Sequence, residues 1–238
     1  MFEIVRRLVR RGRAKIRRVL SVLQKKCFIY KKVVRKEIGD SNDRVYEVWI
    51  PDADEVSGSV SMTVKRAGRY TCRWNNVQNV LFRMGYRFGS FGTHEMLGDI
   101  ALHYRARYEP EGDSYLSVYG WTEEPMVEFY VVENWGTVRP EKGEYKKTII
   151  SDGEEYDIYT RVRYDAPSIG DSSDFTQYWS VRRTKRTEGY IDISEHFRAW
   201  EDIGMGMGKL YEISLCVEGC NGGSGSASIV RNDMTWAH

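Results

Sequence analysis

From Val45 onward the chain alternates apolar and polar residues over short runs, the pattern of strands that bury one face in a core. Ten such runs follow one another, beginning with VYEVWI and ending with LYEISLCVEG, and turn-forming segments such as EPEGD lie between them. The SDGEE turn between two of these runs predicts a hairpin. Many short strands at regular spacing predict an all-β sandwich.

One segment, DISEHFRAWEDIG, has the spacing of a helix instead. Asp192 and Glu195 stand three residues apart, as in a capping box, at its predicted start. Phe197, Trp200 and Ile203 then fall on one face, which predicts a single helix whose aromatic residues pack under a sheet.

The first 36 residues differ from the rest of the chain. Their apolar positions, from Ile4 to Leu23, recur at helical spacing with Arg and Lys between them, which predicts a basic amphipathic helix interrupted at Gly12. The longest apolar run is too short for a secretory signal or a membrane span. Two roles stay open: an arm that binds an anionic surface, or a leader that takes no part in the activity. Residues 37–44 are polar and predict a linker, so residues 1–44 form a leader and linker and residues 45–238 form the domain.

Length and charge narrow the function further. At 238 residues the chain is long enough for one sizeable β domain. The chain has 36 Lys and Arg residues and 34 Asp and Glu residues, and residues 1–36 contain 14 of the basic residues and one of the acids. The body of the chain, residues 37–238, therefore has 22 basic and 33 acidic residues. An acidic body offers no electrostatic footprint for nucleic acid. The 16 Tyr and 7 Trp favour strands and surfaces that stack on sugars.

The cysteines and histidines predict neither a disulfide framework nor a metal site. Cys216 and Cys220 lie on one predicted strand, about 13 Å apart, which is beyond disulfide reach. Cys27 and Cys72 have no zinc-like spacing, and the four histidines are scattered. We therefore expect no metal and no cofactor.

Two isolated carboxylates stand out within strand-like runs. Glu128 lies in MVEFYVVENW, on the same strand face as Met126 and Tyr130, while Val127 and Phe129 lie on the opposite face. An unpaired carboxylate in a core would cost several kcal/mol, so its face is predicted to line a cleft. Glu218 interrupts a second run near the C-terminus, which predicts a pair of acids contributed by distant strands.

Several segments, in this order, resemble the signature segments of glycoside hydrolase family 11, the endo-1,4-β-xylanases: VEFYVVENWGTVRP, YDIYTRVRYDAPSI, FTQYWSVRRTKR, HFRAW, and VEG followed by GSGSAS. The resemblance extends over roughly residues 45–230. It implies a β-jelly roll, a sandwich of two curved antiparallel sheets with one α-helix, that grips a polysaccharide in its cleft.

The resemblance also implies the chemistry. Glu128 matches the nucleophile of a retaining glycosidase and Glu218 matches its general acid/base, two carboxyl groups that lie about 5 to 5.5 Å apart in such enzymes. The charge of Glu128 is expected to raise the pKa of Glu218, so that Glu218 holds the proton it must donate. Asn79 matches the residue that hydrogen-bonds the acid/base, and Asn at this position implies a pH optimum near neutrality.

Further matches imply how the sugar chain is bound. Trp49 falls at a stacking platform, since a planar aromatic suits the apolar face of a pyranose. Arg163, Pro167 and Ser168 match the thumb, a hairpin loop that closes over the cleft. The matches to groups that flank or hydrogen-bond the sugars are Tyr119, Tyr130, Gln177 and Tyr211.

The chain departs from the family pattern at three places. IPDADEVSG follows Trp49 where the family commonly has a Gly-rich turn, which is expected to reshape the distal subsite. Val138 stands where the family pattern usually has a Tyr, and the absence of that Tyr is expected to remove an aromatic contact. Cys220 replaces an aromatic residue on the strand face of Glu218, which is expected to open the cleft there.

The resemblance favours a secreted, monomeric enzyme that cleaves xylan and binds no nucleic acid. Secretion is expected because a polymeric substrate cannot enter a cell, although the leader is no recognisable signal peptide. Two other functions remain open: a non-catalytic carbohydrate-binding sandwich, which would not need both Glu128 and Glu218, and a β-1,4-glucanase of related fold.

Overall fold

The computed structural model describes residues 30–51 and 58–237. The chain divides into two units, residues 1–31 and 32–238, and the second unit holds nearly all of the described residues. The predicted basic helix, whose apolar positions run from Ile4 to Leu23, lies outside the described residues, as does Cys27.

The described chain is mostly strand. Its elements in order are β1 (Tyr30–Val33), β2 (Glu37–Ser41), β3 (Arg44–Trp49), β4 (Ser59–Lys65), β5 (Tyr70–Arg87), the 3-10 helix η2 (His94–Leu97), β6 (Ile100–Glu111), β7 (Ser114–Glu123), β8 (Val127–Trp135), β9 (Glu144–Ser151), β10 (Glu154–Pro167), β11 (Ser172–Arg182), β12 (Glu188–Asp192), α2 (Ile193–Glu201) and β13 (Lys209–Trp236). The all-β prediction with one α-helix is confirmed.

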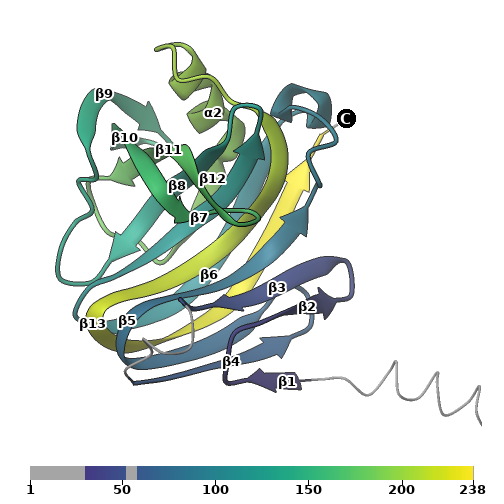
Figure 1. Cartoon of the computed structure of the whole chain (residues 1–238), viewed down its shortest axis with the longest axis vertical. Coiled ribbons are helices and arrows are strands. Elements are labelled where there is room, and N and C mark those ends of the chain that lie inside the picture. The colour runs from purple at the N-terminus through teal and green to yellow at the C-terminus, as the bar shows by residue number, and fades with distance from the viewer. Residues whose placement is uncertain (1–29, 52–57, 238) are drawn as a thin grey trace, which may run out of the picture. The chain divides into compact units, whose positions relative to one another are not determined.

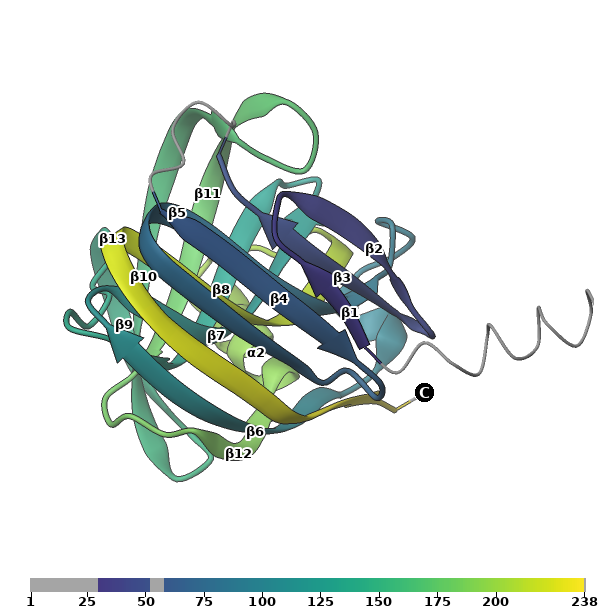
Figure 2. The ribbon, with the colours of Figure 1, turned by 90° about the horizontal axis from the view of Figure 1, so that it is seen from below.

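Two long strands, β5 and β13, join the layers of the jelly roll. The second half of β5 pairs with β3 and the first half of β13, and the first half of β13 also pairs with β7. The first half of β5 pairs with β4 and the second half of β13, which also pairs with β6. Figure 1 shows β13 running down one layer and returning up the other, and Figure 2 shows β5 and β13 side by side. The two layers therefore form one hydrogen-bonded sheet of 13 strands.

Irregular residues mark the place where these strands bend. The register of β13 against β5 shifts between Cys220 and Gly223 and again before Gly225, and Asn76 in β5 has a positive φ of 50°. Bulges of this kind increase the local twist and bend a strand. The runs RYTCRW and NVLFRMGYRF, which the sequence presents as separate, thus belong to one bent strand.

One pair of strands departs from the antiparallel prediction. β8 and β11 run parallel, with Glu128 opposite Gln177. Segment 136–143 carries the chain past this position to the far edge of the layer, where β9 forms, and the β9–β10 and β10–β11 hairpins then bring it back. β11 consequently returns beside β8 in the same direction.

Alternation along β8 divides its side chains between two clusters, as predicted. Val127 and Phe129 are buried in the main core, whereas Tyr130 belongs to a second cluster formed largely of aromatic residues. Because successive side chains point to opposite faces of a strand, Glu128 lies on the same side as Tyr130.

The predicted linker at residues 37–44 is wrong. Glu37–Ser41 and Arg44–Trp49 form a hairpin, β2 and β3, and β3 continues the layer by pairing with β5. Tyr46, which is 2% exposed, supports this hairpin by donating a hydrogen bond from its hydroxyl to Glu37 at 2.7 Å. Polar residues in a two-stranded edge face water, so their composition resembles that of a linker.

Helix α2 begins as predicted. The Asp192 side chain accepts a hydrogen bond from the Glu195 backbone N–H at 2.9 Å, which satisfies one of the free donors of the first turn. Phe197 and Trp200 are fully buried in the main core, and Phe129 of β8 packs against both. The helix therefore supports the strand that carries Glu128.

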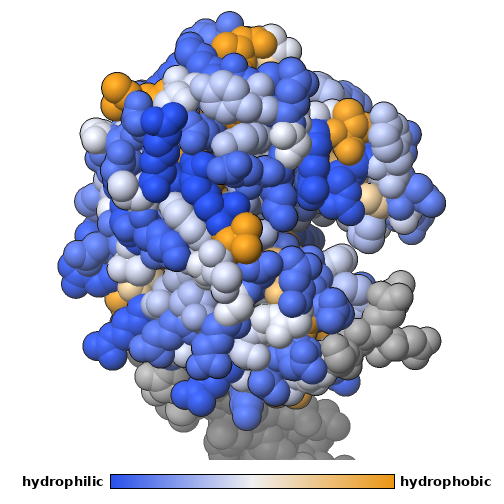
Figure 3. Space-filling model, turned by 90° about the vertical axis from the view of Figure 1, so that its left-hand side faces the viewer, coloured by the Kyte–Doolittle hydropathy of each residue, from blue (hydrophilic) through white to orange (hydrophobic). Residues whose placement is uncertain are grey.

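The three cysteines of the described ranges form no disulfide. Cys72, Cys216 and Cys220 are free, as the strand geometry predicted for the last two. Figure 3 shows a face of the molecule that is mainly hydrophilic, with isolated hydrophobic residues. None of the helices in the described ranges is long and apolar enough to cross a membrane.

We expect Trp200→Ala to lower the free energy of unfolding by about 3–5 kcal/mol, because it leaves a cavity among Phe129, Tyr178 and Phe197 and removes the hydrogen bond from the indole N–H to Ser180. Denaturant titration followed by tryptophan fluorescence and circular dichroism measures this loss. Arg198→Ala on the exposed side of the same helix is the control and should cost less than about 1 kcal/mol.

Candidate active site

A cleft of about 420 Å³ lies over the aromatic cluster on the side of the sheet that carries Glu128. Its lining comes from β3, β5, β7, β8, β10, β11 and β13, from the loop between β10 and β11, and from Lys36 before β2 and Lys142 before β9. Every residue that the sequence analysis assigned to the site lines this cleft: Trp49, Asn79, Tyr119, Glu128, Tyr130, Arg163, Pro167, Ser168, Gln177, Tyr211 and Glu218.

Glu128 accepts three hydrogen bonds from neighbouring side chains. The hydroxyls of Tyr119 and Tyr130 donate to its Oε1 at 2.9 and 3.1 Å, and the amide of Gln177 donates to its Oε2. The strand order produces this arrangement, since β7 and β11 are the two neighbours of β8. Both oxygens of the carboxylate are therefore held in place.

Burial and hydrogen bonding act on Glu128 in opposite directions. The carboxyl is 7% exposed, and burial raises its pKa because the charged form loses its hydration. The hydrogen bonds from Gln177, Tyr119 and Tyr130 lower the pKa and oppose that rise, as does the charge of Arg163. The donors thus stabilise an anion at this buried position.

Glu218 has fewer donors. The Asn79 amide donates to its Oε1 at 3.2 Å, whereas Oε2 is buried and has no hydrogen-bond partner within the described ranges. Burial raises the pKa of Glu218 to about 7, with the charge of Glu128 as the next cause. The predicted direction is confirmed, but burial rather than the neighbouring charge is the larger cause. Below about pH 7 most molecules therefore have a protonated Glu218.

Tyr130 links the two acids. Its hydroxyl donates to Glu128 and also lies close enough to Glu218 to lower the pKa of that carboxyl. The Tyr130 ring is stacked on Trp179, with ring centroids 3.8 Å apart and planes 2° from parallel. Because Trp179 is 2% exposed, the stack fixes the hydroxyl between the two carboxyl groups.

Arg161 was missed by the sequence analysis. Its Nε–H donates to Oε1 of Gln177, and since arginine has donors only, the amide oxygen of Gln177 must face it. The amide nitrogen is then left to face Glu128. Arg161 and Arg163 alternate along β10 and line the same cleft, a spacing that could have indicated a shared face.

A second arginine, Arg83, supports the other side of the site. It lies between two acids, 2.7 Å from Glu47 and 3.0 Å from Glu212, and its guanidinium lies 4.9 Å from the ring centroid of Tyr119. The indole N–H of Trp121 donates to the Tyr119 hydroxyl at 2.5 Å. Together these contacts fix one of the donors to Glu128.

The rims of the cleft carry the residues that were matched to sugar binding. Trp49 is partly exposed, with the Lys36 ammonium 5.8 Å from its ring centroid, and Tyr211 is covered by Arg87 at 5.4 Å. Pro167 and Ser168 lie at the end of β10, where the chain turns toward β11, and Pro167 is exposed. Aromatic and polar groups thus surround the two acids.

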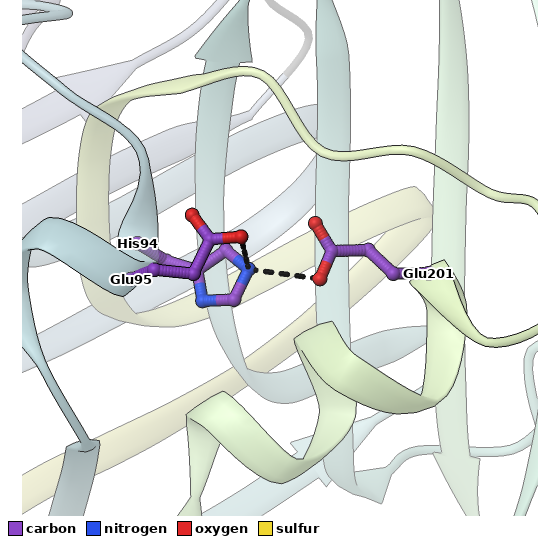
Figure 4. A group of neighbouring side chains, drawn as sticks. All are labelled: His94, Glu95 and Glu201. Carbon is purple, nitrogen blue, oxygen red and sulfur yellow. Dashed lines mark hydrogen bonds and ion pairs between the residues drawn. The ribbon is translucent and has the colours of Figure 1, made fainter.

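One cluster of possible metal ligands lies elsewhere. His94, Glu95 and Glu201 meet where η2 approaches the end of α2, and Figure 4 shows one ring nitrogen of His94 facing an oxygen of each carboxylate. Nε2 of His94 lies 3.1 Å from Glu201 and 3.8 Å from Glu95. None of the three lines the cleft, and the contact with Glu201 joins η2 to α2.

Comparison with known proteins agrees with the geometry of the cleft. The model of the family described as "Glycosyl hydrolases family 11" matches residues 41–230. The chain belongs to this family.

Similar family 11 sequences and structures come from several organisms. The chain is 46% identical over 202 residues to "Endo-1,4-beta-xylanase A" of Bacillus pumilus, and the aligned region covers 85% of this chain and 86% of that protein. It is 44% identical to the "Bifunctional xylanase/deacetylase" of Pseudobutyrivibrio xylanivorans, covering 85% of this chain and 33% of that longer protein. The solved structure of the family 11 xylanase from Neocallimastix patriciarum superposes with a TM-score of 0.77 at 33% identity, covering 87% of this chain and all of that chain.

The departures from the family pattern have different places in the structure. Cys220 lines the cleft beside Glu218, so the replaced aromatic residue would have been part of its wall. Val138 is 55% exposed and does not line the cleft. Residues 52–57 of the altered turn after Trp49 lie outside the described residues.

We expect Glu128→Gln to lower the pKa of Glu218 while leaving it above the ordinary glutamate value of about 4.3, because the substitution removes the neighbouring charge but not the burial. A pH titration of the side-chain carboxyl carbons by ¹³C NMR measures the pKa of Glu218 in the wild-type protein and in Glu128→Gln. An unchanged pKa of Glu218 would contradict electrostatic coupling between the two acids, and a fall to the ordinary value would contradict the leading role of burial.

Proposed function

We propose that the protein is a retaining endo-1,4-β-xylanase in which Glu128 is the nucleophile and Glu218 is the general acid/base. The observation that carries the proposal is the unequal environment of two buried acids in one cleft. Glu128 is held by three donors, whereas Glu218 has a pKa of about 7 and keeps its proton. A retaining glycosidase needs this division between an anion and an acid.

In the first step, Glu218 protonates the glycosidic oxygen as its bond to the anomeric carbon breaks. The Glu128 carboxylate attacks that carbon from the opposite face and forms a glycosyl-enzyme ester. The two tyrosines and Gln177 keep the carboxylate oriented for this attack, which lowers the entropic part of the barrier.

In the second step, Glu218 changes from acid to base. Once Glu128 is esterified its charge is gone, and the pKa of Glu218 falls because that charge was one of the causes of its rise. Glu218 then takes a proton from water as the water oxygen attacks the anomeric carbon and releases Glu128. Net retention follows from two inversions.

The proposed substrate is xylan, and the lining of the cleft supports this choice. Trp49 and Tyr211 offer planar faces near the rims, and Pro167 and Ser168 line the cleft at the turn between β10 and β11, where a close wall would disfavour the hydroxymethyl group of a glucan. Release of reducing sugar from xylan, compared with carboxymethyl cellulose, separates the xylanase from a β-1,4-glucanase. A carbohydrate-binding protein without activity would release sugar from neither.

The setting of the enzyme is also a proposal. We infer that it acts outside the cell, because its substrate is an insoluble or large polymer, and that it acts as a monomer, because both acids and the donors that hydrogen-bond them belong to one chain. A domain that starts near residue 45 would divide the β2–β3 hairpin, so the pairing of these strands favours a start before Glu37. N-terminal sequencing of the protein from its native host tests the processing of the leader.

We expect Glu128→Gln and Glu218→Gln each to reduce kcat on xylan by a factor of about 10² to 10⁴, because each removes one of the two groups that the reaction requires. The control is Glu188→Gln on β12, outside the cleft, which should keep wild-type activity. With an activated aryl xyloside, azide should rescue Glu128→Ala to give an α-azide and Glu218→Ala to give a β-azide. The opposite stereochemistry would exchange the two roles.

We expect Asn79→Asp to move the optimum of the pH–rate profile toward acid by about one unit. The introduced carboxyl must hold a proton to replace the hydrogen bond that Asn79 donates to Glu218, and that form dominates only at lower pH. Gln78→Glu adds the same charge at the next residue and should shift the optimum less. A wild-type optimum below about pH 4.5 would contradict the assignment of Glu218 as an acid with a raised pKa.

A further inference from the structure

The cleft is positively charged, although the body of the protein is acidic. Residues 37–238 hold 22 basic and 33 acidic side chains. The cleft reverses this balance, because six cationic side chains line it against three acids: Lys36, Arg83, Arg87, Lys142, Arg161 and Arg163 against Glu47, Glu128 and Glu218. A cleft that bound only a neutral polymer would not need such a reversal.

Three of these cations have no carboxylate within ion-pair distance in the described ranges. Arg83 and Arg87 are paired with Glu47 and Glu212, whereas no ion pair involves the cations that we call the cationic cluster, Lys142, Arg161 and Arg163. The two acids of the site cannot balance all three charges. Glu128 carries one negative charge and Glu218 is protonated below about pH 7.

The first two members of the cationic cluster lie on adjacent segments. Gly143 is packed so closely against Arg161 that a Cβ added to the glycine would lie 2.7 Å from the Cβ of Arg161. Lys142 is the residue before that glycine and therefore stands beside Arg161 on the same wall of the cleft. A larger residue at position 143 would push the two segments apart.

An aromatic surface supports both cations. The Lys142 ammonium lies 5.6 Å from the ring centroid of Tyr115, and the Arg161 guanidinium lies 6.0 Å from that of Trp179. The two rings contact each other edge to face, with centroids 6.1 Å apart. Aromatic rings next to cations suit a sugar that carries a negative charge, because the rings contact its apolar face and the cations contact its anion.

The surroundings of Arg161 favour a nearby negative charge. Partial burial and the charge of Arg163 both lower the pKa of Arg161, which means that the surroundings disfavour its charged form. The indole N–H of Trp179, which is 2% exposed, has no hydrogen-bond acceptor within the described ranges. A ligand with an anionic group at the cationic cluster would stabilise the charges that the protein leaves unbalanced.

We propose that the cationic cluster binds the carboxylate of an acidic side group on the xylan, so that the enzyme prefers uronic-acid-substituted xylan over neutral xylan. This inference rests on the proposed xylanase function and names the form of the substrate. Arginine forms charge-assisted, often bidentate, hydrogen bonds with a carboxylate, and the neighbouring lysine adds a second charge.

The test compares one polymer in two charge states. Uronic-acid-substituted xylan is used as such and after chemical reduction of its carboxyl groups, which leaves the branches in place but neutral. At about pH 6 the uronic carboxyl is ionised and Glu218 keeps its proton. We expect kcat/KM to be about fivefold higher on the acidic polymer at about 0.01 M salt, and this preference to shrink at about 1 M salt.

Lys142→Gln should reduce that preference by at least about half, since it removes one cation of the cluster. The charge of Lys142 also lowers the pKa of Glu218, and the comparison of the two polymers at one pH cancels that effect. Arg161→Gln should reduce the preference as well. This substitution also removes the hydrogen bond from Arg161 to Gln177, which can change the rate on both polymers, but such a change cancels in the ratio of the two rates. The matched control is Lys147→Gln on β9, an exposed lysine outside the cleft, which should keep the wild-type ratio.

Equal rates on the two polymers, or a preference that Lys142→Gln leaves unchanged, would overturn the inference. Competition by acetate at the concentration at which free glucuronate competes would also overturn it, because the cluster would then bind any small carboxylate and not a uronic acid in particular. Failure to cut any of the xylans, acidic, reduced or linear, would instead reject the xylanase function, so the two failures are distinguishable.

Discussion

The structure depends on keeping two buried carboxyl groups in different protonation states within one cleft. Burial raises the pKa of both and favours the neutral form of each. The donors differ: three side chains hydrogen-bond Glu128, whereas Glu218 has the Asn79 amide and the Tyr130 hydroxyl that it shares with Glu128, and its Oε2 has no partner among the described residues. The distribution of hydrogen-bond donors therefore decides which acid can act as a nucleophile and which can donate a proton.

The fold supplies those donors through strand order. Gln177 stands opposite Glu128 because β11 returns beside β8, and Tyr119 stands on the other neighbour, β7. Asn79 and Glu218 belong to β5 and β13, the two strands that bend from one layer into the other, and they lie near that bend. The irregular residues after Cys220 that bend β13 are thus part of the reason why Glu218 faces the cleft. On the opposite face of β8, Phe129 rests on α2, which anchors the strand from behind.

Local patterns in the sequence predict much of this architecture, because alternation, capping and turn chemistry act over a few residues. Alternation along β8 places Glu128 opposite the core, and Asp192 caps its helix as expected. Contacts that depend on strand order could not be predicted in the same way. The parallel β8–β11 pair, the continuity of β5 and the partners of Arg161 arise from segments far apart in the chain.

Residues 37–44 were predicted to be a linker because an edge hairpin and a linker share the same polar composition. Strand patterns alone singled out Glu128 and Glu218 as a pair of acids, whereas the remaining site residues were located by resemblance to a family, because neither composition nor periodicity would have selected them, for example from 16 tyrosines.

The buried acid near the bend of β13 also couples folding to proton binding. In the unfolded chain the carboxyl of Glu218 has an ordinary pKa of about 4.3, whereas in the folded protein its pKa is about 7, so the native state binds this proton more tightly. Its contribution to stability is fully present below the unfolded pKa and is lost as the pH rises through the folded one. When the pH rises above about 7, Glu218 loses the proton that catalysis requires, and the same loss lowers the stability of the native state. Conformational stability and turnover therefore decline over the same alkaline pH range.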